Sequence, residues 1–156
     1  MVVKALKEHS ISIVAIIIVL ALLFTSIYVL FFSSVWVEGT VDHKTLAGTK
    51  GDATYTLVMV TPYGLDIEPS VSDLFNASMT NLTITPEIEQ ELQSRGYQLY
   101  YVANIRARSH DPVNGLYPGQ TEGLFTSKEI FNRLSISEDI EYQVSYFHSN
   151  WVTGMR

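Results

Sequence analysis

Three histidines and one neighbouring aspartate are the side chains of this sequence best suited to metal binding or proton transfer. His43, His110 and His148 follow an apolar N-terminal stretch, and Asp111 adjoins the second of them. A zinc or copper site needs three or four converging ligands, two of them usually close together in the sequence. No His-x-His or His-x₃-His pair occurs. We therefore interpret these four residues as surface or core residues and keep them as candidate metal ligands only.

Other motifs that carry out catalysis are missing from the sequence. It has no Gly-x-Ser-x-Gly turn for a serine nucleophile, no glycine-rich phosphate loop and no calcium-binding loop. Glu87, Glu89 and Glu91 are typical of the start of a helix, where carboxylates complement the helix dipole. We expect no catalytic residue and no cofactor, so a binding role is favoured over an enzymatic one.

The composition limits the number of domains and the kinds of partner. The 156 residues allow one domain beyond the apolar stretch, and no cysteine is present to form a disulfide or a thiolate metal site. After Ser34 there are 8 lysines and arginines against 15 aspartates and glutamates, a net charge of −7. Such an acidic domain repels nucleic acid, so we expect no nucleic-acid partner.

A long uncharged stretch, residues 11–32, precedes the polar part of the chain. A helix of this length measures roughly 33 Å, which matches a hydrocarbon core of about 30 Å. The stretch is longer than the apolar part of a signal peptide, and the bulky Phe31 and Phe32 do not suit a cleavage site. We predict an uncleaved transmembrane signal anchor over residues 11–33. A pilin helix is the competing interpretation, but the small residue at its cut and its early glutamate are missing.

The charges on either side of this stretch predict its orientation. Lys4 and Lys7 precede it, whereas the first charges after it are acidic, and positive flanks favour the cytoplasmic side. We expect residues 1–10 in the cytoplasm and residues 34–156 in an extracytoplasmic domain of a cell-membrane protein. Sequons at Asn76 and Asn81 are candidate glycosylation sites that agree with this placement. The expected aromatic collar at the outer membrane interface consists of Tyr28, Phe31, Phe32 and Trp36.

Four segments of the domain have the composition of β-strands. Residues 35–42 and 54–60 are rich in β-branched and aromatic side chains, and the turn-like residues 47–52 between them predict a hairpin. Residues 97–108 and 140–147 are two further strands by the same criteria. Residues 123–125 are a candidate fifth strand. Alternation places four side chains of the last long strand on one face: Ile140, Tyr142, Val144 and Tyr146.

Two short helices are expected as well. Thr85 is suited to cap a helix that has Pro86 in its first position and ends before Gly96. A second helix is expected to begin at Thr126, which would form a capping box with Glu129, and to run to about residue 134. We also expect a helical turn over residues 71–76 and surface loops over residues 61–70 and 110–122.

These elements predict a mainly-β domain, a β-barrel or sandwich of SH3-like or OB-like size with two or three short helices, after a single N-terminal transmembrane helix. The stretch "GTVDHK" from Gly39, the strand "YTLVMV" from Tyr55 and the segment from Phe125 to Asp139 resemble uncharacterised membrane-anchored small β-barrel domains. The resemblance covers residues 39–60 and 124–144 and implies a fold and a membrane location, but no activity. Glu138 stands where the pattern prefers glycine. Residues 61–123 have no counterpart, so we interpret them as an insertion.

Exposed aromatic residues are the remaining signal for function. The chain has nine tyrosines, seven phenylalanines and two tryptophans, and such rings suit protein interfaces when they are not buried. The C-terminal residues look like a tail without an internal partner. Our candidates for an interface are Tyr117, Phe147, Trp151 and Met155.

The function that these features favour is that of a non-catalytic single-pass membrane protein of a prokaryotic envelope. It would be an accessory or structural subunit of a larger membrane assembly, with the lipid bilayer and other membrane protein subunits as its partners. One alternative is a cell-surface adhesin or pilin-like filament subunit. Another is a membrane-anchored enzyme or metal-binding protein that uses His43, His110 or His148.

Overall fold

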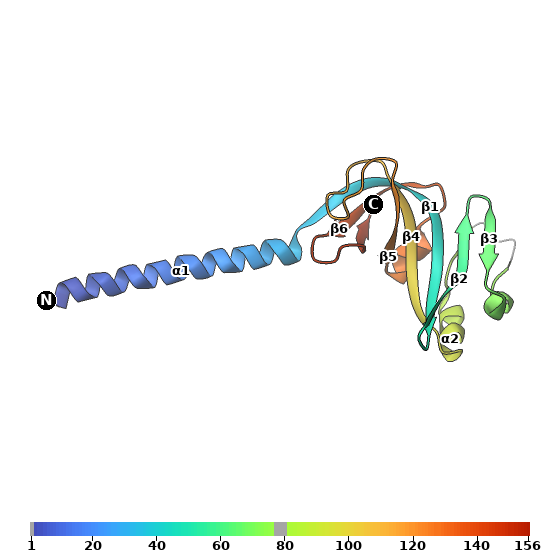
Figure 1. Cartoon of the computed structure of the whole chain (residues 1–156), viewed down its shortest axis with the longest axis horizontal. Helices are drawn as coiled ribbons and strands as arrows, with labels where there is room; N and C mark the ends of the chain where they lie inside the picture. Colours follow the sequence, from blue (N-terminus) through green and yellow to red (C-terminus); the bar gives the residue numbers. More distant parts are fainter. Residues whose placement is uncertain (1, 77–80) are drawn as a thin grey trace. The chain divides into compact units, whose positions relative to one another are not determined.

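The computed structural model describes the backbone of residues 2–76 and 81–156 and, within the first helix, the side chains of residues 14–29. The chain forms two compact units that meet in sequence between Ser33 and Ser34. The first unit is one helix, α1 (Val2–Phe32), and the second is Ser34–Arg156, here called the β domain (Figure 1).

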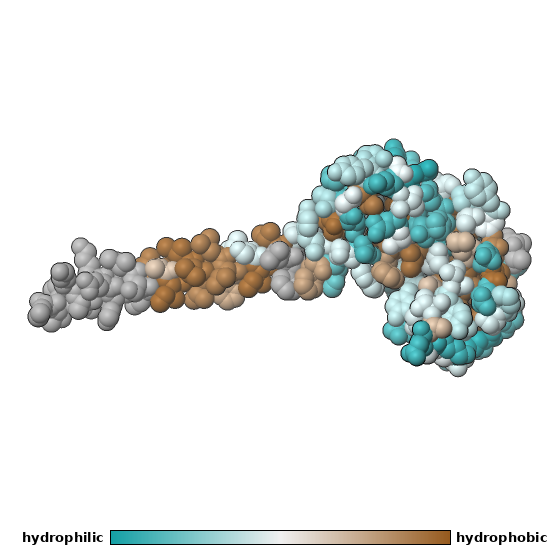
Figure 2. Space-filling view, viewed as in Figure 1, coloured by the Kyte–Doolittle hydropathy of each residue, from teal (hydrophilic) through white to brown (hydrophobic). Residues whose placement is uncertain are grey.

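The described side chains of α1, residues 14–29, are all exposed, and most of them are apolar (Figure 2). Two of its described hydroxyl side chains bond within the helix: Thr25 and Ser26 each donate to the carbonyl four residues earlier at 2.8 Å. Among the residues that the structure describes, no helix is both long enough and apolar enough to cross a membrane.

The β domain is built on an antiparallel sheet, as the strand-rich sequence predicts. Its described strands are β1 (Ser34–Lys50), β2 (Ala53–Thr61), β3 (Gly64–Ile67), β4 (Gln98–Ala107), β5 (Thr121–Thr126), β6 (Asp139–Ser145) and β7 (Val152–Met155). The predicted strands over residues 97–108, 123–125 and 140–147 correspond to β4, β5 and β6 and are confirmed, with shifted ends.

The long strand β1 organises the sheet. One of its edges pairs with β4, and its other edge pairs with β6 in the first half and with β2 in the second half. A parallel bridge between Phe125 and Trp151 then links β5 to the start of β7, and the Phe125 N–H donates to the Asn150 carbonyl at 2.7 Å. The pairings β7–β6–β1–β4–β5 and this bridge form a closed ring of strands.

Strand β1 contains a β-bulge at Asp42, where the face of the strand that points inward changes. Val37, Gly39 and Val41 are buried before it, whereas Lys44, Leu46 and Gly48 are buried after it, so the inward face changes from odd to even residues. A hairpin forms around the predicted turn, but its paired part is residues 44–50 with β2. The prediction that residues 35–42 pair with residues 54–60 was wrong, because residues 34–40 pair with β6 instead.

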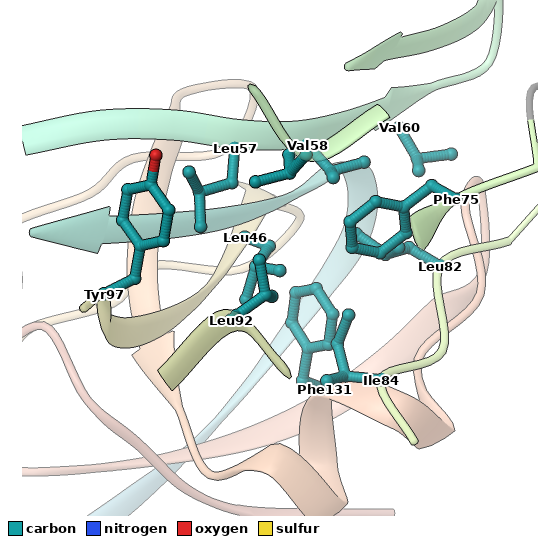
Figure 3. Close-up of a cluster of buried hydrophobic side chains, with 11 residues drawn as sticks. Leu46, Leu57, Val58, Val60, Phe75, Leu82, Ile84, Leu92, Tyr97 and Phe131 are labelled. Atoms are coloured by element: carbon teal, nitrogen blue, oxygen red, sulfur yellow. The ribbon is translucent and has the colours of Figure 1, made fainter. Parts of the chain in front are cut away.

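Two clusters of buried side chains fill the β domain. The first lies between the β1–β2 hairpin and the helical segments and contains Leu46, Leu57, Leu92 and Phe131 (Figure 3). The second lies inside the ring of strands and contains Val37, Ile105, Leu124 and Tyr142. Strand β1 contributes to both clusters, since the bulge turns its inward face from one cluster toward the other.

The predicted N-terminal cap is present in the first of the two short helices but not in the second. In α2 (Pro86–Ser94), the Thr85 side chain accepts from the Ile88 N–H at 3.4 Å, as predicted. In α3 (Lys128–Arg133), the cap is Ser127, which accepts from the Ile130 N–H at 3.3 Å, and the predicted Thr126 cap was wrong. Thr126 is instead the last residue of β5. The predicted turn at residues 71–76 is the 3-10 helix η1 (Pro69–Leu74).

Three expectations about the β domain were wrong. Residues 61–123 do not behave as an insertion, because they supply β4, which pairs along most of β1, and β3, which extends the sheet. The C-terminal residues are not a free tail, because β7 pairs with β6. Tyr146 does not continue the buried face of β6, since that strand ends at Ser145 and Tyr146 is exposed.

Gly39 lies where β1 pairs with both β4 and β6, and close packing leaves no room there for a side chain. A Cβ atom there would lie 2.5 Å from Ile105 Cγ2, 3.0 Å from Tyr142 Cε1 and 3.2 Å from the Arg106 carbonyl oxygen. Gly39→Ala is therefore expected to lower the free energy of unfolding by about 1–3 kcal/mol, because a packed core cannot make room for the methyl group. Denaturant unfolding of the full chain in detergent measures this effect.

Gly154→Ala is the matched control for that experiment. Its Cβ would meet the far end of the Gln143 side chain, with Oε1 at 2.8 Å, and this flexible group can move away. We expect a much smaller loss of stability than for Gly39→Ala. Equal losses for the two variants would show that close packing around Gly39 is not the cause.

Candidate functional site

The structure does not gather the candidate metal ligands into one site. His43 lies on β1, His110 and Asp111 follow β4, and His148 lies in the turn between β6 and β7. His110 Nδ1 forms a hydrogen bond with the Leu116 carbonyl oxygen at 2.9 Å, and the imidazole ring stacks on the Tyr117 ring. Among the side chains that the structure describes, residues 14–29, 33–76 and 81–156, no group of three or more histidines, aspartates or glutamates could hold a metal ion.

Asp111 is a fully buried carboxylate that holds a surface loop in place. Its Oδ1 accepts from the Val113 and Asn114 N–H groups at 2.9 and 3.1 Å, and its Oδ2 accepts from Asn114 Nδ2 at 2.8 Å. Tyr142 Oη donates to the same Oδ2 at 3.2 Å from inside the ring of strands. Because these donors occupy the carboxylate oxygens, Asp111 acts as a structural residue here rather than as a metal ligand.

Lys44 is a fully buried lysine that the sequence analysis missed. Its Nζ donates to the carbonyls of Leu82 and Leu134 at 2.7 and 2.9 Å and to Asn81 Oδ1 at 3.1 Å. The ammonium group also lies 4.5 Å from the centre of the Phe131 ring. One side chain therefore ties β1 to the segment before α2 and to the end of α3.

The ionisation of Lys44 reflects this burial. Desolvation lowers the pKa of Lys44 from its ordinary value of 10.5 to about 8, and the nearby charge of Glu138 opposes that shift. A lysine with such a pKa is the kind of group that enzymes use as a nucleophile. In this chain, its three N–H bonds point at protein oxygens and its side chain is inaccessible to solvent. Lys44 therefore acts as a structural tie, and only the fold could reveal it, because its acceptors are distant in sequence.

The two candidate glycosylation sites differ in their surroundings. Asn81 accepts from Lys44 through Oδ1 and donates through Nδ2 to the Leu134 carbonyl at 3.1 Å, so both ends of its amide are bonded within the protein. Asn76 is exposed, and the rest of its sequon lies outside the described residues. Glycosylation at either position stays a prediction.

The predicted aromatic collar is divided between the two units. Tyr28 is an exposed residue of α1, and the side chains of Phe31 and Phe32 lie outside the described residues. Trp36 belongs to β1, where it is 40% exposed and carries the Arg156 guanidinium 4.4 Å above its ring. The collar stays a prediction.

Three of the four interface candidates are exposed. Tyr117, Phe147 and Trp151 expose 65, 50 and 45% of their surface, whereas Met155 is partly buried and packs against the cluster inside the ring of strands. Trp151 also contacts the Phe125 ring at 5.6 Å. The first three therefore suit an interface better than Met155 does.

Among the described aromatic side chains the most exposed is that of Tyr63, which was not one of the candidates. It lies at the turn between β2 and β3 and exposes 99% of its surface. Thr61 shapes this turn, since its hydroxyl accepts from the Tyr63 N–H and donates to the Gly64 carbonyl, each at 3.2 Å. A tight turn thus holds a large aromatic ring in solvent, where the ring contributes nothing to the core of the β domain.

Tyr63 stands beside two adjoining hollows of about 410 and 370 Å³. They share Thr61, Pro62, Tyr63 and Ser137, and the smaller one also contains His43, Asp42 and Arg106. Asp42 and Arg106 form an ion pair at 3.2 Å across the strands β1 and β4. We call this surface the Tyr63 cleft. It combines an exposed aromatic side chain with polar groups that could orient a partner.

Comparison of the chain with protein-family models, curated proteins and solved structures returned no match. The resemblance to membrane-anchored small β-barrel domains therefore stays a prediction.

Proposed function

We propose that this chain is a single-pass membrane protein whose β domain binds another membrane protein, as an accessory or structural subunit of a larger assembly. The N-terminus would lie in the cytoplasm and the β domain on the other side of the membrane. The observation that carries the binding role is Tyr63, a fully exposed aromatic side chain on a tight turn beside a polar cleft.

The membrane location rests on the sequence and on the helix. The uncharged stretch, residues 11–32, extends beyond the described side chains of α1 at both ends. Within the described part, most of the exposed side chains are apolar ones that lipid tails solvate well, such as Ile17, Leu22 and Phe24. The helix continues to Phe32, and the β domain starts at Ser34, so a small β-barrel would follow the anchor almost directly.

The binding role rests on the properties of the Tyr63 cleft. Tyrosine is enriched among the residues that dominate binding energies, because its rigid ring loses little entropy and its hydroxyl can bond to a partner. The Asp42–Arg106 pair supplies charges of both signs beside it. The buried carboxylate of Asp111 is already bonded within the domain, so the cleft is the better candidate for recognition.

Photocrosslinking from position 63 in intact membranes tests this proposal. With benzoylphenylalanine in place of Tyr63, we expect a discrete heavier adduct after irradiation, and we expect Tyr63→Ala to lose copurification of the same protein in mild detergent. The matched control is Tyr55, an aromatic residue of the adjoining strand, β2, that is 38% exposed. Tyr55→Ala should keep the partner.

The same experiment can refute the binding role of the cleft. Copurification that is unchanged by Tyr63→Ala, or an adduct that forms equally from positions 55 and 63, would contradict it. Because Tyr63 is exposed, its replacement should leave the unfolding transition unchanged, and circular dichroism checks this point.

A further inference from the structure

The turn between β6 and β7, residues 146–151, is an exposed aromatic surface distinct from the Tyr63 cleft. Tyr146, Phe147 and Trp151 each expose about half of their surface, at 51, 50 and 45%. His148, Trp151 and Thr153 line a hollow of about 350 Å³ next to it. From residue 142 to residue 155 the chain carries no aspartate, glutamate, lysine or arginine, although the domain as a whole is acidic.

The strand register places this turn at the start of the β domain. Strand β6 is antiparallel to β1, and its last residue, Ser145, pairs with Ser34, the first residue of β1. Paired strands lie about 4.8 Å apart and consecutive Cα atoms 3.8 Å apart, so Ser145 lies within about 10 Å of the residue before Ser34. This estimate rests on the covalent link alone and holds for any orientation of the β domain on α1.

The turn has an internal framework that holds its rings in place. The Phe147 N–H donates to Ser145 Oγ at 3.2 Å, and the Trp151 N–H donates to the His148 carbonyl at 3.2 Å. The Asn150 N–H donates to Asn114 Oδ1 at 2.8 Å, which fixes the turn against a neighbouring loop. The turn is therefore a preformed surface, and its partner need not order it on binding.

We propose that residues 146–151 rest in the headgroup region of the bilayer and hold the β domain against the membrane surface. This inference rests on the proposed anchor, which would bring Ser34 to the membrane surface and Ser145 with it. Tryptophan and tyrosine favour this region because an apolar ring and a polar atom meet both of its environments. The absence of carboxylates removes the repulsion that anionic headgroups would exert on the rest of the domain.

Quenching of tryptophan fluorescence by brominated lipid tests the proposal, because the chain has only two tryptophans. The full chain with Trp36→Phe keeps Trp151 as its single probe. In phosphatidylcholine vesicles brominated near the headgroup end of the acyl chains, we expect Trp151 to lose fluorescence intensity relative to the same chain in unbrominated vesicles. We also expect Trp151 to emit at a shorter wavelength than a tryptophan at a remote position of the β domain. That remote probe is Tyr55→Trp in a chain without Trp36 and Trp151, since Tyr55 pairs with Gly48 near the opposite end of β1.

A third probe separates this inference from the proposed anchor. Tyr28→Trp, again as the only tryptophan, reports whether α1 is embedded. Quenching of positions 28 and 151 but not of position 55 supports the inference. Quenching of position 28 alone would overturn it, leave the anchor standing and point to a protein as the partner of the turn. Quenching of neither position would overturn the anchor and this inference together.

A paired substitution shows whether the aromatic rings are responsible. In the chain with Trp36→Phe, the changes Tyr146→Ser and Phe147→Ser are expected to reduce the quenching of Trp151. Both side chains are about half exposed, so circular dichroism should show an intact fold. Quenching that is unaffected by these changes would contradict a lipid contact made by this turn.

Discussion

Replacing Lys44 with methionine is expected to lower the free energy of unfolding by about 2–4 kcal/mol. Methionine keeps most of the volume of the side chain but cannot donate a hydrogen bond. The Leu82 carbonyl and Asn81 Oδ1 therefore lose the bonds that Lys44 donates to them. The Leu134 carbonyl keeps its bond from Asn81 Nδ2. Buried acceptors without a donor account for the loss. Denaturant unfolding of the full chain in detergent measures it.

Lys50→Met is the matched control. Lys50 lies on the same strand, β1, and its Nζ lies 5.3 Å from the centre of the Tyr97 ring, but the residue is exposed. We expect a loss below about 1 kcal/mol, because an exposed cation–π contact contributes little. A loss for Lys44→Met that is no greater than that for Lys50→Met would mean that the buried bonds of Lys44 do not stabilise the fold.

The lowered pKa of Lys44 adds a dependence on pH with a definite sign. Between about 8, its value in the folded chain, and 10.5, its ordinary value, the unfolded chain binds the proton more fully than the folded chain. Stability then rises with pH across this window. The difference in unfolding free energy between the native chain and Lys44→Met is therefore expected to widen from pH 8 upward. A difference that narrows over the same window would contradict the lowered pKa.

Replacing Asp111 with alanine is expected to cost about 3 kcal/mol. The change removes the acceptor for two backbone N–H groups, for Asn114 Nδ2 and for the buried hydroxyl of Tyr142. It releases the loop between β4 and β5 and leaves a polar group inside the ring of strands without its partner. Thermal or denaturant unfolding followed by circular dichroism measures the loss.

Two further variants identify the cause of that loss. Asp42→Ala removes a partly exposed carboxylate that pairs with Arg106, and we expect it to cost at most about 1 kcal/mol. Tyr142→Phe combined with Asp111→Ala should cost less than the sum of the two single changes, because each removes the same bond. Additive losses would show that Tyr142 and Asp111 stabilise the fold independently.

Local sequence patterns predicted the parts of the fold that depend on neighbouring residues. The alternation of Ile140, Tyr142 and Val144 marks the buried face of β6, and Thr85 with Pro86 marks the start of α2. These features were readable because period-two burial and helix capping involve residues a few positions apart.

The parts that were missed depend on contacts between distant residues. The bulge at Asp42 changes the inward face of β1, so a single alternating pattern could not extend across it. Strand β7 has only four residues and is held by its pairing with β6, and nothing in the sequence of those residues alone requires a strand. Ser127 rather than Thr126 caps α3, because Thr126 already pairs with Tyr101 in the sheet.

The candidate site was less predictable than the fold. Tyr117, Phe147 and Trp151 could be chosen from their residue types, and the structure leaves them exposed. Tyr63 could not be chosen in this way, because a tyrosine next to a strand-like run is usually buried and only the turn at Pro62 turns it outward. Lys44 gave no signal at all, since its acceptors at positions 82 and 134 are brought to it by the fold.

The most direct test of the central proposal, an anchored chain with its β domain outside the cytoplasm, is the labelling of single cysteines in intact cells. The chain has no cysteine, so each introduced thiol is the only target. With Asp52→Cys at the exposed β1–β2 turn and Ser10→Cys before the uncharged stretch, a membrane-impermeant maleimide should label position 52 in intact cells and position 10 only after permeabilisation. Labelling of position 10 but not position 52 in intact cells, or protection of both in a chain that alkaline carbonate releases from membranes, would contradict the proposal.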